Sequence, residues 1–236
     1  MEAAQTTTMS VLAFLALASM TTVALWPVFL VGVQLMCPLG AREWEDRYMR
    51  FADRRTWGSG CCRIPHGSNV VSNAAFFAAA LWHAGHTPWM AMGAGVVGVG
   101  STLFHLDPTH DGLLVDRISM VIGLACVVDP CGILNWFVVT SVGLITLYAW
   151  YFHDEVVPYL ALQAFTPLLL YWYAPGMTIT TLLLYLLAKL AEACDAEVLQ
   201  FTRKHLRGCM SLSGHALKHV LAAAALVAVQ APDCAL

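Results

Sequence analysis

The sequence predicts an all-α protein, a polytopic membrane helix bundle, and two observations carry this prediction. Hydrophobic residues make up 59% of the 236 residues and charged residues only 11%, whereas a soluble domain usually carries about 25% charged residues. Apolar stretches also follow one another with short polar connections, and many of them are close to the roughly 20 residues that a membrane-spanning helix needs.

Eight stretches are candidate spans, namely 10–36, 69–86, 88–106, 112–132, 134–152, 156–174, 177–199 and 210–230. The first is too long for the apolar core of a signal peptide, and no Lys or Arg precedes it, so we expect a retained helix, with a cleaved signal as the alternative. The chain then divides into an N-terminal transmembrane helix or signal anchor (1–36), a polar interfacial segment (37–68) and a core of seven spans (69–230).

The charges of the chain are few and unevenly placed. A net charge of −3 provides no basic surface for a nucleic acid. Six of the twelve Lys and Arg residues lie between Arg42 and Arg63, and three more (Arg203, Lys204 and Arg207) precede the last span. The positive-inside rule predicts that this face of a multi-pass protein is cytosolic.

Five polar residues lie in or beside these apolar stretches. Ser101 and His105 belong to GSTLFH, Asp116 to VDRISM, and His215 and His219 to SGHALKH. Ionisable groups persist in a membrane mainly when they are paired, solvated in a cavity or bound to a metal. In the predicted topology all five lie near the face that carries the Arg-rich segment. Three imidazoles leave one position open, which is the ligand count of a catalytic rather than a structural zinc site.

The chemistry that such a site would support is hydrolysis. Bound Zn²⁺ lowers the pKa of its water and polarises a carbonyl, Asp116 could act as a general base or orient a ligand, and Ser101 could donate a hydrogen bond to an oxyanion. Each residue also has a simpler interpretation, because a histidine at a helix end can be solvated, Asp116 can pair with Arg117, and Ser101 can permit close helix packing. The shared depth and face of the five residues favour a zinc-dependent membrane hydrolase.

The same motifs resemble those of a known superfamily. GS-x-x-FH, an aspartate eleven residues after that histidine, and a late GH-x-x-KH are similar to the motifs of alkaline ceramidases, whose superfamily includes the adiponectin and progestin receptors and Per1-like proteins. The stretch IPHGSNVVSNAAFFAAALW (64–82) resembles the start of the first core helix of that family. The likeness extends over about residues 48–230 and is greatest to bacterial and algal members.

This resemblance implies a seven-helix hydrolase core with one extra N-terminal helix. It implies zinc on His105, His215 and His219, with Ser101 and Asp116 as the catalytic site residues. The implied reaction cleaves the amide bond of a membrane lipid, ceramide, into a sphingoid base and a fatty acid, with no protein partner. The stretch TWGSGCCRIPHGSN carries no carboxylate where eukaryotic relatives have a calcium site, so we expect no calcium.

Two further functions and two structural contacts stay open at this level. A receptor-like or Per1-like member of the same superfamily could use zinc structurally or on another lipid, whereas a transporter is disfavoured because the chain shows no repeated halves. Lys189 and Glu192 can pair across one helical turn, and Glu192 or Asp195 could meet Lys218. The remaining pair in the first core helices, His83 and His86, is expected to be solvated.

Overall fold

The computed structural model describes residues 66–128, 133–173, 176–205 and 212–230, and these are helical with short connections and no strand. The all-α prediction is therefore confirmed for this part of the chain. The predicted N-terminal helix (10–36) and all but the last residues of the interfacial segment (37–68) lie outside the described residues. The described helices are α3 (Gly67–Ser72), α4 (Ala74–His83), α5 (Pro88–Leu106), α6 (His110–Val128), α7 (Ile133–His153), α8 (Val156–Tyr173), α9 (Ile179–Ala193), α10 (Asp195–His205) and α11 (Gly214–Val227).

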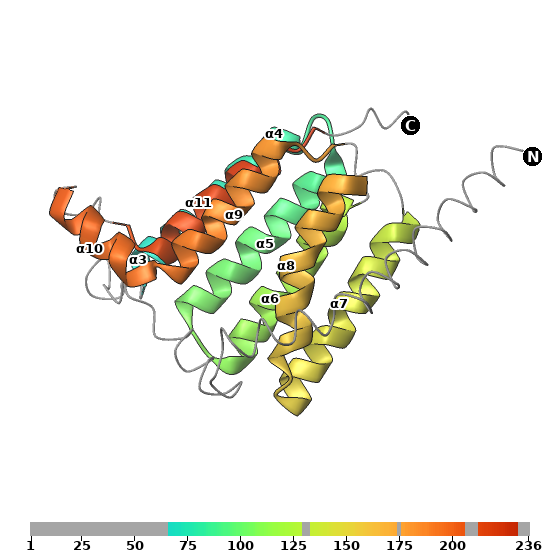
Figure 1. The fold of residues 1–236 in the computed structure, drawn as a ribbon, viewed down its shortest axis with the longest axis horizontal. Helices are drawn as coiled ribbons and strands as arrows, with labels where there is room; N and C mark the ends of the chain where they lie inside the picture. Colours follow the sequence, from blue (N-terminus) through green and yellow to red (C-terminus); the bar gives the residue numbers. More distant parts are fainter. Residues whose placement is uncertain (1–65, 129–132, 174–175, 206–211, 231–236) are drawn as a thin grey trace, which may run out of the picture. The chain divides into compact units, whose positions relative to one another are not determined.

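These helices pack in sequence order and close on themselves. α4 packs on α5, α5 on α6, α6 on α7, α7 on α8 and α8 on α9, and α11 then packs against both α9 and α4. Figure 1 shows α11 lying alongside α9, with α10 continuing from that pair at one end. The last helix therefore completes a ring of helices around a common interior.

Two predicted spans differ from the helices that form. The stretch 69–86 contains two helices, α3 and α4, which meet at Asn73. The stretch 177–199 is not one helix, because α9 ends at Ala193 and α10 begins at Asp195 and runs to His205. The second half of that predicted span was therefore wrong, and so was the loop that we expected after residue 199.

Side chains at the helix starts explain where α9 and α11 begin. Thr178 precedes α9 and accepts a hydrogen bond from the Thr181 backbone N–H at 3.1 Å, and Ser213 does the same for α11 with the N–H of Ala216 at 3.1 Å. Such caps satisfy backbone donors that the first turn of a helix leaves without a partner. α5 begins instead with Pro88, a residue that suits the first helical position.

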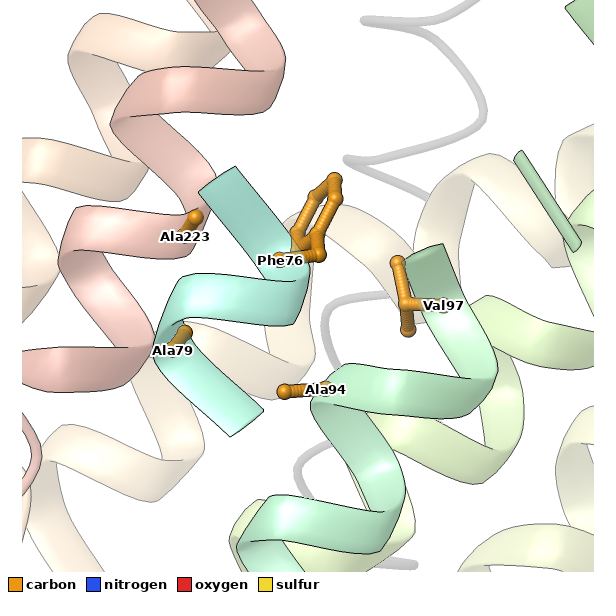
Figure 2. Packing of buried hydrophobic residues seen from close by; sticks show 5 residues of the cluster. All are labelled: Phe76, Ala79, Ala94, Val97 and Ala223. Carbon is orange, nitrogen blue, oxygen red and sulfur yellow. The ribbon is translucent and has the colours of Figure 1, made fainter. Parts of the chain in front are cut away.

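A core cluster of small and medium side chains joins α4, α5 and α11. Figure 2 shows Phe76 and Ala79 from α4, Ala94 and Val97 from α5, and Ala223 from α11. The alanines allow the three helix backbones to approach closely, and Phe76 fills the space between them. The same three helices carry the predicted metal ligands and their neighbours, so this cluster fixes their mutual position.

Among the residues that the structure describes, one helix is long and apolar enough to cross a membrane. This helix is α5, Pro88–Leu106, and α11 is a shorter apolar helix. The length and composition of one helix indicate membrane association only weakly.

Candidate metal centre

The three predicted histidine ligands meet in the interior of the ring. His105 lies in the last turn of α5, and His215 and His219 lie in the first turns of α11. All three are buried, and one nitrogen of each lies within 4.8 Å of one nitrogen of the others. The structure thus contains a group of three histidines that could hold a metal ion.

The spacing of the rings suits a tetrahedral ion. The Nε2 atoms of His105 and His215 lie 3.2 Å apart. Zinc–nitrogen bonds of 2.0–2.1 Å at tetrahedral angles place two ligand nitrogens about 3.3 Å apart. The ring centroids are 4.9 Å apart for His105 and His215, 5.1 Å for His105 and His219, and 4.9 Å for His215 and His219. These separations are compatible with three histidine nitrogens holding one metal ion.

A hydroxyl from α3 orients one of the ligands. Ser72 donates a hydrogen bond to the carbonyl of Asn69 at 2.9 Å, and its Oγ lies 2.8 Å from Nδ1 of His219. A hydroxyl has one proton to donate, and both Asn69 and Nδ1 of His219 are within reach of it. In the tautomer that suits a metal, Ser72 donates to Asn69, Nδ1 of His219 donates to Ser72, and the lone pair is on Nε2.

The predicted serine and aspartate lie beside the histidines. Oγ of Ser101 is 3.4 Å from Nε2 of His219, and the Ser101 hydroxyl also hydrogen-bonds the carboxylate of Asp116. Asp116 is buried. Its neighbour Arg117 lies over the ring of Trp150, with the guanidinium carbon 3.7 Å from the ring centroid. The five residues singled out in the sequence thus occupy one buried site.

The start of α11 is held by three separate contacts. Ser213 donates to the side-chain oxygen of Asn69 at 3.1 Å, and the backbone N–H of His215 donates to the Asp195 carboxylate at 2.6 Å. Gly214 lies between them. A Cβ added at Gly214 would collide with the carbonyl of Ala191 and would lie 2.7 Å from the Cα of Asp195. Because residue 214 has no side chain, the backbone of the SGH motif packs directly on the junction of α9 and α10, and this contact positions His215.

A partly buried ion-pair cluster joins α9 to α11 beside the metal ligands. Glu192 accepts from Lys189 at 2.8 Å and from Lys218 at 2.9 Å. Both predicted contacts are therefore confirmed, with Glu192 rather than Asp195 as the partner of Lys218. Nζ of Lys218 also lies 3.3 Å from Nε2 of His215, a contact that was not predicted. The sequence did contain an indication of it, because Lys218 lies between two predicted ligands in the apolar segment HALKH.

The prediction for His83 was wrong, and that for His86 was right. His83 is buried, with Nδ1 2.8 Å from the Thr87 hydroxyl and Nε2 3.0 Å from the carbonyl of Leu226. His83 thus ties the end of α4 to the end of α11. His86 is exposed.

An apolar cavity of about 160 Å³ lies within the ring, next to the histidines. Its wall includes Phe76, whose ring centroid is 5.9 Å from that of His219, together with Val97, Met120 and Ala222. Val97 precedes Ser101 by four positions, and Met120 follows Asp116 by four, so each lies one turn from a site residue on the same helix face. The few polar wall residues are Tyr159, Gln163, Thr181 and Tyr185.

In the part of the chain that the structure describes, the fold is all-helical and holds a buried histidine cluster that could bind a metal, with an apolar cavity about one helical turn away. No protein-family model matches this chain, and no curated protein or solved structure gives a significant match to it.

Proposed function

We propose that this chain is a polytopic membrane hydrolase that binds zinc at His105, His215 and His219 and cleaves the amide bond of a ceramide-like lipid. The observation that carries the proposal is a buried cluster of three histidines, with a carboxylate and a hydroxyl beside it, about one helical turn from residues that line an apolar cavity. A site that needed the metal only for structure would not require this open apolar space near the ligands.

The residues around the histidines have the functional groups that amide hydrolysis needs. Zinc held by the three histidines would supply an acidic water and a polarised carbonyl. Asp116 accepts a proton from the attacking water and returns it to the leaving nitrogen, and Ser101 donates a hydrogen bond to the carbonyl oxygen. The water oxygen forms a new C–O bond, the C–N bond breaks, and the products are a carboxylic acid and an amine.

The cavity favours a lipid acyl chain as the substituent of that amide. Its wall is nearly all apolar, and its volume of about 160 Å³ is below the roughly 300–1,000 Å³ of pockets that enclose a whole drug-sized ligand. The cavity therefore suits the part of one acyl chain that is nearest to the amide, and the rest of the chain would leave the protein between helices.

The distribution of polarity supports insertion in a membrane. Charged side chains such as Asp116, Arg117 and Lys218 are buried, whereas large apolar side chains such as Leu81, Ile145 and Leu190 are exposed. Water as the surrounding solvent disfavours an extended apolar exterior, and lipid favours it. We take the ring of helices to be the core of the predicted multi-pass bundle, with the metal centre near its Arg-rich, cytosolic face.

The test compares detergent-purified wild type with His215→Ala and with His86→Ala, a control that removes an exposed histidine outside the site. Metal content is measured by mass spectrometry and fatty-acid release on a panel of ceramides. Wild type and His86→Ala are expected to carry about one zinc per chain and to release fatty acid, whereas His215→Ala loses both because a three-nitrogen set is reduced to two.

Other outcomes would replace the proposal. Zinc without turnover on any ceramide would move the function to the receptor-like or Per1-like alternative. A wild type without zinc would exclude the metal centre itself.

A further inference from the structure

Lys218 is a charged side chain buried at the metal centre. It is only 8% exposed and lies on α11 between two of the proposed ligands. A buried ammonium is costly unless it is paired and hydrogen-bonded. Its contacts include the Glu192 carboxylate at 2.9 Å and Nε2 of His215 at 3.3 Å. The ion pair with Glu192 explains how a buried charge is tolerated, and the contact with His215 shows that the ammonium points toward the histidine cluster.

The contact with His215 uses the lone pair that a metal would take. A neutral imidazole has one nitrogen that accepts, and that nitrogen can serve an N–H donor or a metal but not both. Nε2 of His215 also lies 3.2 Å from Nε2 of His105, so it faces the centre of the ligand group. A metal bound there takes this lone pair, and the Lys218 hydrogen directed at it must turn to another acceptor at the same place.

Glu192 keeps the ammonium from turning away. Its two oxygens are shared between Lys218 and Lys189, and the Nζ of Lys189 also donates to the side chain of Gln163 at 2.8 Å. The Glu192 carboxylate is therefore held by Lys189 of α9, and Lys189 is itself held by Gln163 of α8. A donor fixed in this way loses little entropy when it binds a ligand.

The acceptor that the geometry provides for is an oxygen at the top of the apolar cavity. Ala222 lines the cavity and lies four positions after Lys218, hence on the same face of α11 and one turn away. A chain in the cavity whose polar end faces the histidines would bring that end to within about one helical turn of Lys218. A carboxylate is the group that gains most there, because charge-assisted hydrogen bonds are about twice as strong as neutral ones.

We propose that Lys218 is a further substrate-contacting residue, whose ammonium binds the carbonyl oxygen of the lipid amide and the carboxylate of the fatty acid released from it. This inference rests on the proposed function for the identity of the lipid, but the binding of a fatty-acid carboxylate can be measured without turnover. Lys218 and Ser101 then approach the same oxygen from two helices, α11 and α5.

The experiment compares the binding of hexadecanoate and of hexadecanol, its uncharged analogue, to wild type, Lys218→Met and Lys204→Met. Binding is measured as ligand-dependent thermal stabilisation of the zinc-loaded protein in one detergent. Lys204→Met is the matched control, because it removes the charge of an exposed lysine on α10, outside the ion-pair cluster. Zinc content is measured for every variant.

We expect Lys218→Met to weaken hexadecanoate binding by about tenfold or more, the size of one charge-assisted hydrogen bond. Hexadecanol binding and zinc content should stay unchanged, and Lys204→Met should bind both ligands as wild type does. If Lys218→Met does not fold, the double variant Lys218→Met/Glu192→Gln removes both charges together and carries the same expectation.

Equal loss of both ligands in Lys218→Met, or unchanged hexadecanoate binding, would overturn the role of Lys218 even in an active amidase. Conversely, Lys218-dependent binding of hexadecanoate in a protein that releases no fatty acid from any ceramide would sink the proposed amidase and leave Lys218 as a carboxylate-binding residue. The two failures are therefore distinguishable.

Discussion

His219 shows how one distant hydroxyl can decide which nitrogen of a ligand is presented to a metal. Ser72 is 147 positions away in the sequence, yet its Oγ contacts Nδ1 of His219 at 2.8 Å and the carbonyl of Asn69 at 2.9 Å. Groups that hydrogen-bond the second nitrogen of a ligating imidazole fix its tautomer and orientation, and their loss typically lowers metal affinity about 10–100-fold.

We therefore expect Ser72→Ala to fold and to keep its helical content but to bind zinc about 10–100-fold more weakly than wild type. Competition with a chelator of known affinity measures this directly. Thr146→Ala is the matched control, since Thr146 donates to the carbonyl of Gly143 within α7, and its zinc affinity should equal that of wild type. Equal affinities in all three proteins would remove Ser72 from the metal centre.

Residue identities and spacing predicted the ligand group but not its surroundings. His215 and His219 share a helix face by the i, i+4 rule, and the predicted depth of His105 brought it to the same level. The sequence also pointed to Glu192 as a partner of Lys218. It could not indicate that His83 is buried, because that follows from the carbonyl of Leu226, a contact 143 positions away.

At the scale of whole elements, Gly214 is the residue through which the start of α11 packs closely against α9 and α10. Replacing a helical glycine by alanine usually stabilises a protein by roughly 0.5–1 kcal/mol. At Gly214 the added methyl group would collide with the carbonyl of Ala191, which is backbone and cannot move aside. The sign of the effect should therefore reverse.

We expect Gly214→Ala to lower the free energy of unfolding by about 1–3 kcal/mol, the usual cost of overpacking. Gly95→Ala in α5 is the control, because its new Cβ would meet only the Cβ of Ala80 at 3.9 Å, an ordinary contact, and should be neutral or stabilising. Thermal unfolding in one detergent compares the two. A Gly214→Ala variant as stable as Gly95→Ala would show that α11 can move off the α9–α10 junction.

Hydropathy located most helices and missed two breaks, one at Asn73 and one at Cys194. The apolar stretches 88–106 and 156–174 correspond to α5 and α8 within a residue at each end. The stretch 177–199 was extended too far because its apolar residues continue past Cys194. The break at Cys194 serves a contact that no local pattern reports, since Asp195 at the start of α10 accepts the backbone N–H of His215, 20 positions later.

On the scale of the whole molecule, the polarity of the bundle is inverted relative to a water-soluble core. Its interior holds the histidines, Asp116 and the cluster around Glu192, while α4, α7 and α9 expose large apolar side chains. Composition alone predicted a membrane protein, but which side chains face inward depends on the closure of the ring by α11. Closure by α11 places the site inside the ring of described helices.

The surrounding solvent can be tested at one exposed position in the middle of α7. Ile145 is 68% exposed, and at such a position in water a lysine should change stability by less than about 0.5 kcal/mol. If α7 faces hydrocarbon, the same lysine costs about 2.5–3.5 kcal/mol on an insertion scale.

We expect Ile145→Lys to reduce the membrane-inserted yield and to lower the stability in lipid nanodiscs by about 2.5–3.5 kcal/mol. Gln200→Lys, at an exposed position of α10, should be neutral in both measurements, because the charged side chains of α10, such as Glu197, Arg203 and Lys204, favour a position of this helix outside the hydrocarbon. An Ile145→Lys protein that inserts and unfolds like Gln200→Lys would mean that α7 faces water, and the multi-pass topology would have to be abandoned.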